Sequence, residues 1–146
     1  MQIQKEVFDP KMLADFDLQN FEENHRMDYE EWQSMFKTGE VVVYSARTEQ
    51  LELAALMVLK TTLIDCGMWY FYSIAVAEQY RGMSFGTRLF NKAIESEIAT
   101  GIITSHCHIE NVASIAFHKS LGFRAIEYVP DFYGDYEDAI MWSRPR

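Results

Sequence analysis

The sequence has few cysteines, few cations and no long apolar run. Its two cysteines, Cys66 and Cys107, are too few for a disulfide framework in a chain of 146 residues. We therefore expect free thiols in a reducing, cytoplasmic location, and the first residues show no signal-peptide pattern. No apolar stretch approaches the length of a membrane span, so no membrane partner is expected.

The shortage of cations restricts the possible partners. The chain has 13 Lys and Arg residues and 22 Asp and Glu residues, which gives a formal net charge of −9. Nucleic-acid phosphates would be repelled, so no nucleic acid is expected. An acidic surface suits a cationic partner such as an amine, although solubility alone explains many acidic proteins.

The remaining composition predicts one packed domain over residues 1–146. Hydrophobic residues make up 49% of the chain and aromatic residues 14%, and we find no repeat or linker. Apolar patterning predicts strands over 1–8, 41–46, 51–60, 69–76, 102–109, 123–129 and 138–142, with helices after Asp9, over 29–36, over 86–100 and over 112–121. An antiparallel meander followed by helices indicates the α+β class.

The stretch from Met68 to Phe90 organises the chain. A buried strand ends at Val76, a short polar link follows, and the small residues Gly82, Ser84 and Gly86 lead into a helix. The first N–H groups of such a helix lack partners, so they form an anion site suited to phosphate. The spacing fits neither a P-loop nor a dinucleotide fingerprint, and a plain strand-to-helix connection remains an alternative.

Two segments resemble the GNAT acetyltransferase superfamily. Residues 79–87 are similar to its acetyl-coenzyme A motif, in which Arg81 opens and Gly86 closes the pattern, while Ser84 replaces the middle glycine. A left-handed backbone at Ser84 would be strained. Residues 111–123 resemble the later Asn-to-Gly-Phe segment of the superfamily. The resemblance is nearest to ribosomal-protein alanine N-acetyltransferases, and it implies a three-layer α/β/α fold with six or seven strands and a splayed central strand pair.

The resemblance also implies a site for acetyl-coenzyme A. The backbone of the central strand would pair with the pantetheine amides, and the loop would hold the pyrophosphate. The implied coenzyme-binding residues are Ile74, Ala75, Val76, Arg81, Gly82, Met83, Ser84, Phe85, Gly86, Thr87, Asn111, Ser114 and Phe117. Asn111 would serve almost as well as a plain helix cap.

Two histidines are the candidate catalytic residues. His106 occupies the position of a glutamate that the alanine N-acetyltransferases carry five residues before the motif asparagine, so it is the candidate base. His118 stands where the superfamily usually has a tyrosine acid, and an imidazolium can protonate a thiolate. Ordinary hydrogen-bonding or packing roles remain alternatives for both. His106, Cys107 and His108 lack the spacing of a zinc site, so no metal is expected.

The acceptor site is expected to involve Tyr72, Glu110, Asp131 and Tyr133, with an ordinary acidic turn near Gly134 as the alternative. In the resembling family the first two helices overhang the acceptor, so Glu22, Glu23, Glu30 and Glu31 are further candidates. The chain is thus expected to acetylate a primary amine, first a protein or peptide N-terminus. A small amine, or coenzyme binding without turnover, are the alternatives. Either a monomer or a homodimer fits.

Overall fold

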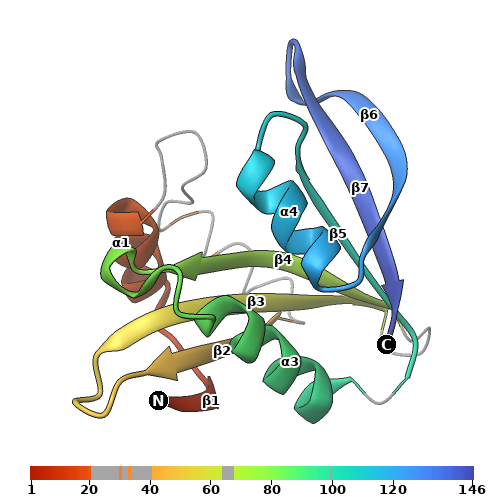
Figure 1. The fold of residues 1–146 in the computed structure, drawn as a ribbon. Helices are drawn as coiled ribbons and strands as arrows, with labels where there is room; N and C mark the ends of the chain where they lie inside the picture. Colours follow the sequence, from red (N-terminus) through yellow and green to blue (C-terminus); the bar gives the residue numbers. More distant parts are fainter. Residues whose placement is uncertain (21–29, 31–32, 34–40, 64–67, 99) are drawn as a thin grey trace. The chain divides into compact units, whose positions relative to one another are not determined.

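Seven strands of mixed direction follow the hydrogen-bonded order β1-β2-β3-β4-β5-β7-β6 (Figure 1). The structure is a computed structural model that describes every residue except 21–29, 31–32, 34–40, 64–67 and 99. The strands are β1 (Gln2–Glu6), β2 (Val41–Arg47), β3 (Leu53–Leu63), β4 (Met68–Val76), β5 (Ile102–His108), β6 (Arg124–Gly134) and β7 (Glu137–Pro145). The helices are α1 (Pro10–Asn20), α3 (Phe85–Glu97) and α4 (Val112–Ser120), with a 3₁₀ turn, η2, over Glu78–Tyr80.

The chain forms two compact units, and strands β3 and β4 contribute to both. The first comprises Met1–Lys60 with Ser73–Glu97, and the second comprises Thr61–Tyr72 with Ile98–Arg146. Among the strand pairs described, only β4 with β5 is parallel. The mixed, mostly antiparallel sheet expected from the sequence is confirmed.

The first unit is a half-sheet with a continuous core. Residues 43–46 of β2 and 54–59 of β3 are buried in unbroken runs, which requires cover on both faces of these strands. Helix α1 buries Leu13 and Phe16, and its first turn is capped because the Lys11 N–H donates to Asp9 Oδ1 at 2.8 Å. Helix α3 buries an apolar stripe of Leu89, Phe90, Ala93 and Ile94, which recur at helical spacing.

The second unit packs α4 against β5 and carries the β6–β7 hairpin. Strand β5 alternates, with Ile103, Ser105 and Cys107 buried on one face. Trp142 of β7 is buried on the same side and donates its Nε1–H to Cys107 Sγ at 3.2 Å. This core fixes which side chains of β5 point outward.

Some expected boundaries differ from the structure. Helix α3 ends at Glu97, three residues before the expected end, and the hairpin loop before β3 extends to Glu52. Strand β6 continues to Gly134 through residues expected to form a loop, because Asp138 of β7 bonds across the hairpin to Asp131 N and to the Tyr128 hydroxyl. The helix expected over 29–36 lies almost entirely outside the described residues, as do Glu22, Glu23, Glu31 and Cys66.

Candidate active site

The connection between β4 and α3 is a candidate anion site in the first unit. The first helical hydrogen bond of α3 runs from Arg88 N to the Ser84 carbonyl at 3.0 Å. The N–H groups of Phe85, Gly86 and Thr87 precede it, so they have no acceptor one turn back in the helix. They lie at the positive end of the helix dipole, where phosphate oxygens bind well.

Two residues of this connection have a left-handed backbone. Gly82 has φ +78° and Ser84 has φ +63°. The expectation that Ser84 would be strained in such a conformation therefore applies to the structure, at a cost of about 1–2 kcal/mol for a non-glycine residue. Ser84 and Met83 are both exposed, so the outer side of the loop is open to a ligand.

The loop is held at its start by side-chain contacts. The Tyr80 hydroxyl donates to Glu52 at 2.7 Å, and the Tyr80 ring lies 5.6 Å from the Phe85 ring. Arg81 Nε donates to the Val76 carbonyl at 3.0 Å, which ties the loop back to the end of β4. The Val76 carbonyl, one of the expected pantetheine partners, is therefore already hydrogen-bonded to the expected phosphate-binding arginine.

Pairing between β4 and β5 stops early in the second unit. The ladder runs from Met68–Ile102 to Tyr70–Thr104, although both strands continue beyond it. At the next position the Ser105 hydroxyl lies 3.1 Å from the Phe71 carbonyl. A side chain thus replaces the backbone partner where the two strands part, as the resemblance implied for the central strand pair.

His118 lies in a buried network on one face of β5. Only 3% of it is exposed, its Nδ1 lies 2.7 Å from the Ser114 carbonyl, and its Nε2 lies 2.8 Å from Ser105 Oγ. A carbonyl only accepts, so Nδ1 carries a hydrogen in this geometry. Burial lowers the pKa of His118, although the hydrogen bond to Ser114 opposes this shift. Trp142 stacks on the ring at 5.1 Å.

His106 lies on the opposite face of β5, in an aromatic cluster. Its ring centroid is 4.9 Å from that of Phe132 and 5.5 Å from those of Tyr70 and Tyr133. The Tyr133 hydroxyl is hydrogen-bonded to His106 Nδ1. Burial, with a smaller contribution from the His118 charge, lowers the pKa of His106 to about 4. Burial raises the pKa of Tyr133, so the phenol keeps its proton and donates it to the neutral imidazole.

His108 supports this cluster from the same face. Its Nδ1 accepts the backbone N–H of Glu110 at 3.0 Å, so Nε2 carries the hydrogen and donates it to the Glu137 carboxylate. The ring stacks on Tyr133 at 5.6 Å with an angle of 18°. Tyr133 is thereby held between the two histidines.

The structure brings together some expected site residues and separates others. His106 and Tyr133 are in contact. Tyr72 is linked to this pair through Tyr70, whose ring centroid lies 6.2 Å from that of Tyr72 and 5.5 Å from that of His106. His106 and His118 do not converge, because adjacent residues of β5 point to opposite faces and His118 contacts Ser105. The two expected catalytic histidines therefore cannot act together from the same side of this strand.

The expected acceptor carboxylates are exposed. Asp131 accepts the N–H of Tyr136 at 2.7 Å and has φ +56°, so it shapes the hairpin turn. The side chain of Glu110 is exposed, and its backbone N–H fixes His108. Both remain expectations as acceptor residues.

The motif asparagine caps α4. Asn111 Oδ1 accepts the N–H of Ser114 at 3.0 Å, which is the helix-cap alternative considered for this residue. Ser114 also positions His118 through its carbonyl, and the Phe117 carbonyl accepts from the Ser120 hydroxyl at 2.7 Å.

Sequence reasoning missed Tyr70, Phe132 and Ser105. Side chains alternate along a strand, so Tyr70 lies on the same face of β4 as the expected Tyr72, and this alternation could have identified it. The Ser105 hydroxyl contacts His118 across 13 residues of sequence, and no local pattern signals such a contact.

Within the described ranges, no group of three or more His, Cys, Asp and Glu side chains is arranged to hold a metal ion. Among those same residues, no helix combines the length and the apolar character that crossing a membrane requires.

Comparison with known proteins identifies a family. Residues 8–123 match the model of the acetyltransferase (GNAT) family. An N-alpha-acetyltransferase of Sulfurisphaera tokodaii is 32% identical over 110 residues, covering 73% of this chain and 64% of the relative. The chain spans less than two-thirds of the length of the curated relatives it matches.

Solved structures share the fold. The ribosomal-protein-S18-alanine N-acetyltransferase of Escherichia coli superposes with a TM-score of 0.81 at 19% identity, covering 99% of this chain and 92% of that one. The spermidine/spermine N-acetyltransferase SpeG of Vibrio cholerae gives a TM-score of 0.76 at 15% identity, with coverage of 99% and 91%. The fold is therefore shared by structures whose names specify different acceptors.

Proposed function

The chain belongs to the acetyltransferase (GNAT) family, and on that premise we propose that it transfers the acetyl group of acetyl-coenzyme A to a primary amine. The observation that carries the proposal is the connection from β4 to α3. Its left-handed Gly82 and Ser84 precede three helix N–H groups that lack intrahelical acceptors. This is the arrangement that a pyrophosphate requires.

We assign the coenzyme to the residues that the resemblance implies. The backbone N–H groups from Gly82 to Thr87 would hold the pyrophosphate beside Arg81, whose own N–H donates to the Glu78 carbonyl at 3.2 Å. The backbone of Ile74, Ala75 and Val76 would hold the pantetheine arm. In the second unit, Asn111, Ser114 and Phe117 would contact the coenzyme through groups not already used in capping α4. No metal takes part in this assignment.

The reaction itself needs little covalent chemistry. The neutral amine nitrogen attacks the thioester carbonyl carbon, the carbon–sulfur bond breaks, the amine loses a proton and the thiolate gains one. A thioester is already activated, so positioning and proton transfer are the main tasks of the protein. The two proton transfers therefore determine which side chains are needed.

We propose that Tyr133 and His106 accept the amine proton as one unit. The single free lone pair of neutral His106 is occupied by the Tyr133 hydroxyl. Tyr133 is 44% exposed and His106 is less exposed, so Tyr133 is the more accessible member of the pair. The amine proton would pass to Tyr133 Oη as the phenolic proton moves to His106 Nδ1.

His118 fits a positioning role better than that of a direct acid. Its ring is buried, its pKa is lowered by burial, and its two nitrogens lie within hydrogen-bond distance of Ser105 and Ser114. We propose that it fixes Ser105 at the point where β4 and β5 part. The acid that protonates the leaving thiolate is then not His118, and solvent water can fill that role.

For the acceptor, we favour a protein or peptide N-terminal amine. A relative that covers most of this chain is named an N-alpha-acetyltransferase. The exposed carboxylates of Glu110 and Asp131, with Tyr72 nearby in the aromatic cluster, suit an ammonium group. Small polyamines are the second candidate, because SpeG has the same fold. A coenzyme-binding module without turnover is the third.

The deciding experiment measures thiol release from acetyl-coenzyme A with a panel of peptides that differ in their N-terminal residue, and with spermidine. We expect saturable release with free N-terminal peptides and none with the same peptides acetylated beforehand. Release with spermidine alone would replace the peptide assignment. Saturable coenzyme binding by calorimetry without any release would favour the binding module, and absence of coenzyme binding would overturn the assignment of the Arg81–Thr87 loop.

A further inference from the structure

The last histidine of β5, His108, has no part in the proposed proton transfer, yet both nitrogens of its ring are hydrogen-bonded. Nδ1 accepts the backbone N–H of Glu110 at 3.0 Å, and Nε2 donates to the Glu137 carboxylate. A ring with one accepting and one donating nitrogen cannot flip without losing both hydrogen bonds. The side chain is only 13% exposed. The tautomer and the orientation of this ring are therefore both fixed.

The fixed ring of His108 lies against Tyr133. The two rings stack at 5.6 Å with an angle of 18°, and Phe132 meets Tyr133 edge-on at 4.9 Å with an angle of 89°. The hydrogen bond to His106 fixes only the hydroxyl end of Tyr133. The plane of the phenol ring is set by the other two contacts. This plane decides from which side the phenolic oxygen can meet an incoming amine.

Backbone hydrogen bonds bring Glu137 to the end of β5. Glu137 is the first residue of β7, and the carbonyl of the next residue, Asp138, accepts the Ile109 N–H at 3.0 Å. The His108 carbonyl accepts the Asn111 N–H at 3.0 Å. His108 therefore connects the β6–β7 hairpin, through its side chain, to the turn that leads into α4.

We propose that Glu137 and His108 form a positioning pair for Tyr133, an inference that rests on the proposed function. Glu137 fixes the imidazole, and the imidazole fixes the plane of the phenol that accepts the amine proton. No proton passes through His108, because its Nε2–H is held by Glu137 and its Nδ1 by a backbone N–H. A reacting side chain held in one orientation by such supporting groups reacts faster than one that is free to turn.

Steady-state kinetics with a peptide acceptor measures the effect of the pair. His108→Ala should lower kcat by about ten- to a hundredfold, the range for a misplaced reacting group, with the KM for acetyl-coenzyme A unchanged. Glu137→Ala should lower kcat by about three- to tenfold, since the His108 ring keeps its other hydrogen bond. Glu137→Gln still offers an oxygen to Nε2–H, so its kcat should stay within a factor of about two of the parent.

Double variants test whether the pair acts through Tyr133. His108→Ala combined with Glu137→Ala should match His108→Ala alone, because Glu137 acts only through the imidazole. In a Tyr133→Phe protein, His108→Ala should lower kcat by no more than a further factor of about two, because no hydroxyl remains to be positioned. The Glu137 side chain is 51% exposed, so Glu137→Ala tests the pair even where His108→Ala does not fold.

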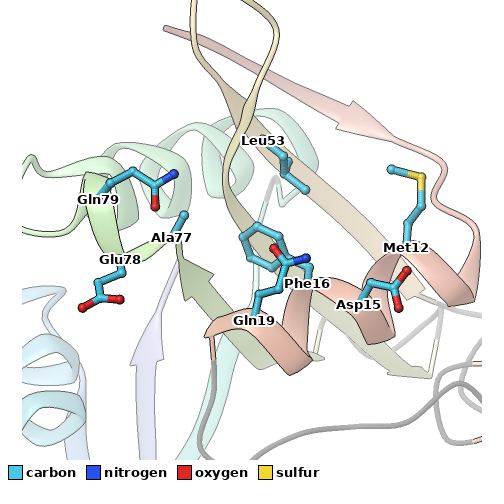
Figure 2. A pocket seen from close by; sticks show the side chains of 8 residues that line it. All are labelled: Met12, Asp15, Phe16, Gln19, Leu53, Ala77, Glu78 and Gln79. Carbon is cyan, nitrogen blue, oxygen red and sulfur yellow. The ribbon is translucent and has the colours of Figure 1, made fainter.

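An NMR measurement separates this inference from the proposed function. The full chain carries carbon-13-labelled tyrosine rings and is observed without coenzyme or amine, and Tyr133→Phe identifies the Tyr133 resonances. A stacked imidazole shifts the resonances of the ring it covers, so His108→Ala and Glu137→Ala should each move them by several line widths. Two controls should leave them in place. Asp135→Asn removes an exposed carboxylate from the same hairpin turn, and Asp15→Asn removes one that lines a pocket in the first unit (Figure 2).

The positioning role is overturned if His108→Ala leaves the Tyr133 resonances in place, if the folded His108→Ala and Glu137→Ala proteins keep the kcat of the parent, or if Glu137→Gln loses as much as Glu137→Ala. Lower stability in urea with an unchanged kcat would assign the pair to the hairpin fold alone. A parent protein without acetyl transfer, in which His108→Ala still moves the Tyr133 resonances, would refute the proposed function and leave the positioning of Tyr133 established.

Discussion

The contact between Tyr133 and His106 gives the first residue-scale prediction. If the two side chains move one proton together, Tyr133→Phe should lower kcat by roughly 10²-fold, the usual contribution of general base catalysis. Acetyl-coenzyme A affinity should be unchanged. His106→Gln should lower kcat by about the same factor. The double variant should lower kcat little further, because either single change already interrupts the proton transfer. Steady-state kinetics with a peptide acceptor measures all three.

The matched control for this prediction is Tyr136→Phe. Tyr136 lies at the tip of the same hairpin, and its side chain is 93% exposed. We expect its kcat to stay within a factor of about two of the parent, since surface changes of this kind have small effects. If the losses from Tyr133→Phe and His106→Gln instead multiplied in the double variant, the two residues would act independently.

The buried hydroxyl of Ser105 gives a second prediction, on stability. It lies within hydrogen-bond distance of both the Phe71 carbonyl and His118 Nε2, and it is 2% exposed. Ser105→Ala leaves these buried groups without their partner, so the free energy of unfolding should fall by about 1–3 kcal/mol. Ser120→Ala removes a similar bond to a backbone carbonyl on the exposed side of α4, and it should cost under about 0.5 kcal/mol. Urea unfolding compares them, and equal losses would contradict the network.

At the scale of elements, substitutions in the connection from β4 to α3 can distinguish the cost of a strained backbone from the cost of a steric clash. A Cβ added at Gly82 meets no atom within 4 Å, yet the residue has φ +78°. Gly82→Ala should therefore destabilise the fold by about 1–2 kcal/mol through its backbone alone. Ser84→Gly relieves similar strain but increases the entropy of the unfolded chain, so its net effect should be under about 1 kcal/mol. Urea midpoints test both, and an unchanged midpoint for Gly82→Ala would refute the strain argument.

The elements also show how far the sequence alone predicts the structure. The buried face of α3 and the alternation of β5 follow from local periodicity, and the sequence predicted a helix and a strand at these positions. The length of β6 was not, because Pro130 and Gly134 signal a turn, while the cross-strand bonds of Asp138 continue the hairpin. The burial of His118 depends on Trp142 and Ser105, which are distant in sequence.

At the scale of the whole molecule, the two perturbed histidines make stability depend on pH. In the folded chain, burial lowers the pKa of His106 to about 4 and also lowers the pKa of His118. An unfolded histidine titrates near pH 6.5. Between about pH 6.5 and 4 the unfolded chain therefore binds more protons, so stability falls as the pH is lowered through this window. Each histidine contributes at most about 1.4 kcal/mol per pH unit.

Urea unfolding at pH 7, 6, 5 and 4.5 measures this effect. We expect the parent to lose stability steadily below pH 6.5, and His106→Gln to lose less over the same range because one of the two titrating groups is absent. The hydrogen bond from Tyr128 lowers the pKa of Asp138 below its usual 3.8. Protonation of this carboxylate therefore destabilises the folded chain only at pH values below the range in which the histidines titrate. Parallel pH profiles for the parent and His106→Gln would show that His106 is not held neutral by the fold, and the base assigned to the Tyr133–His106 pair would then have to be a different group.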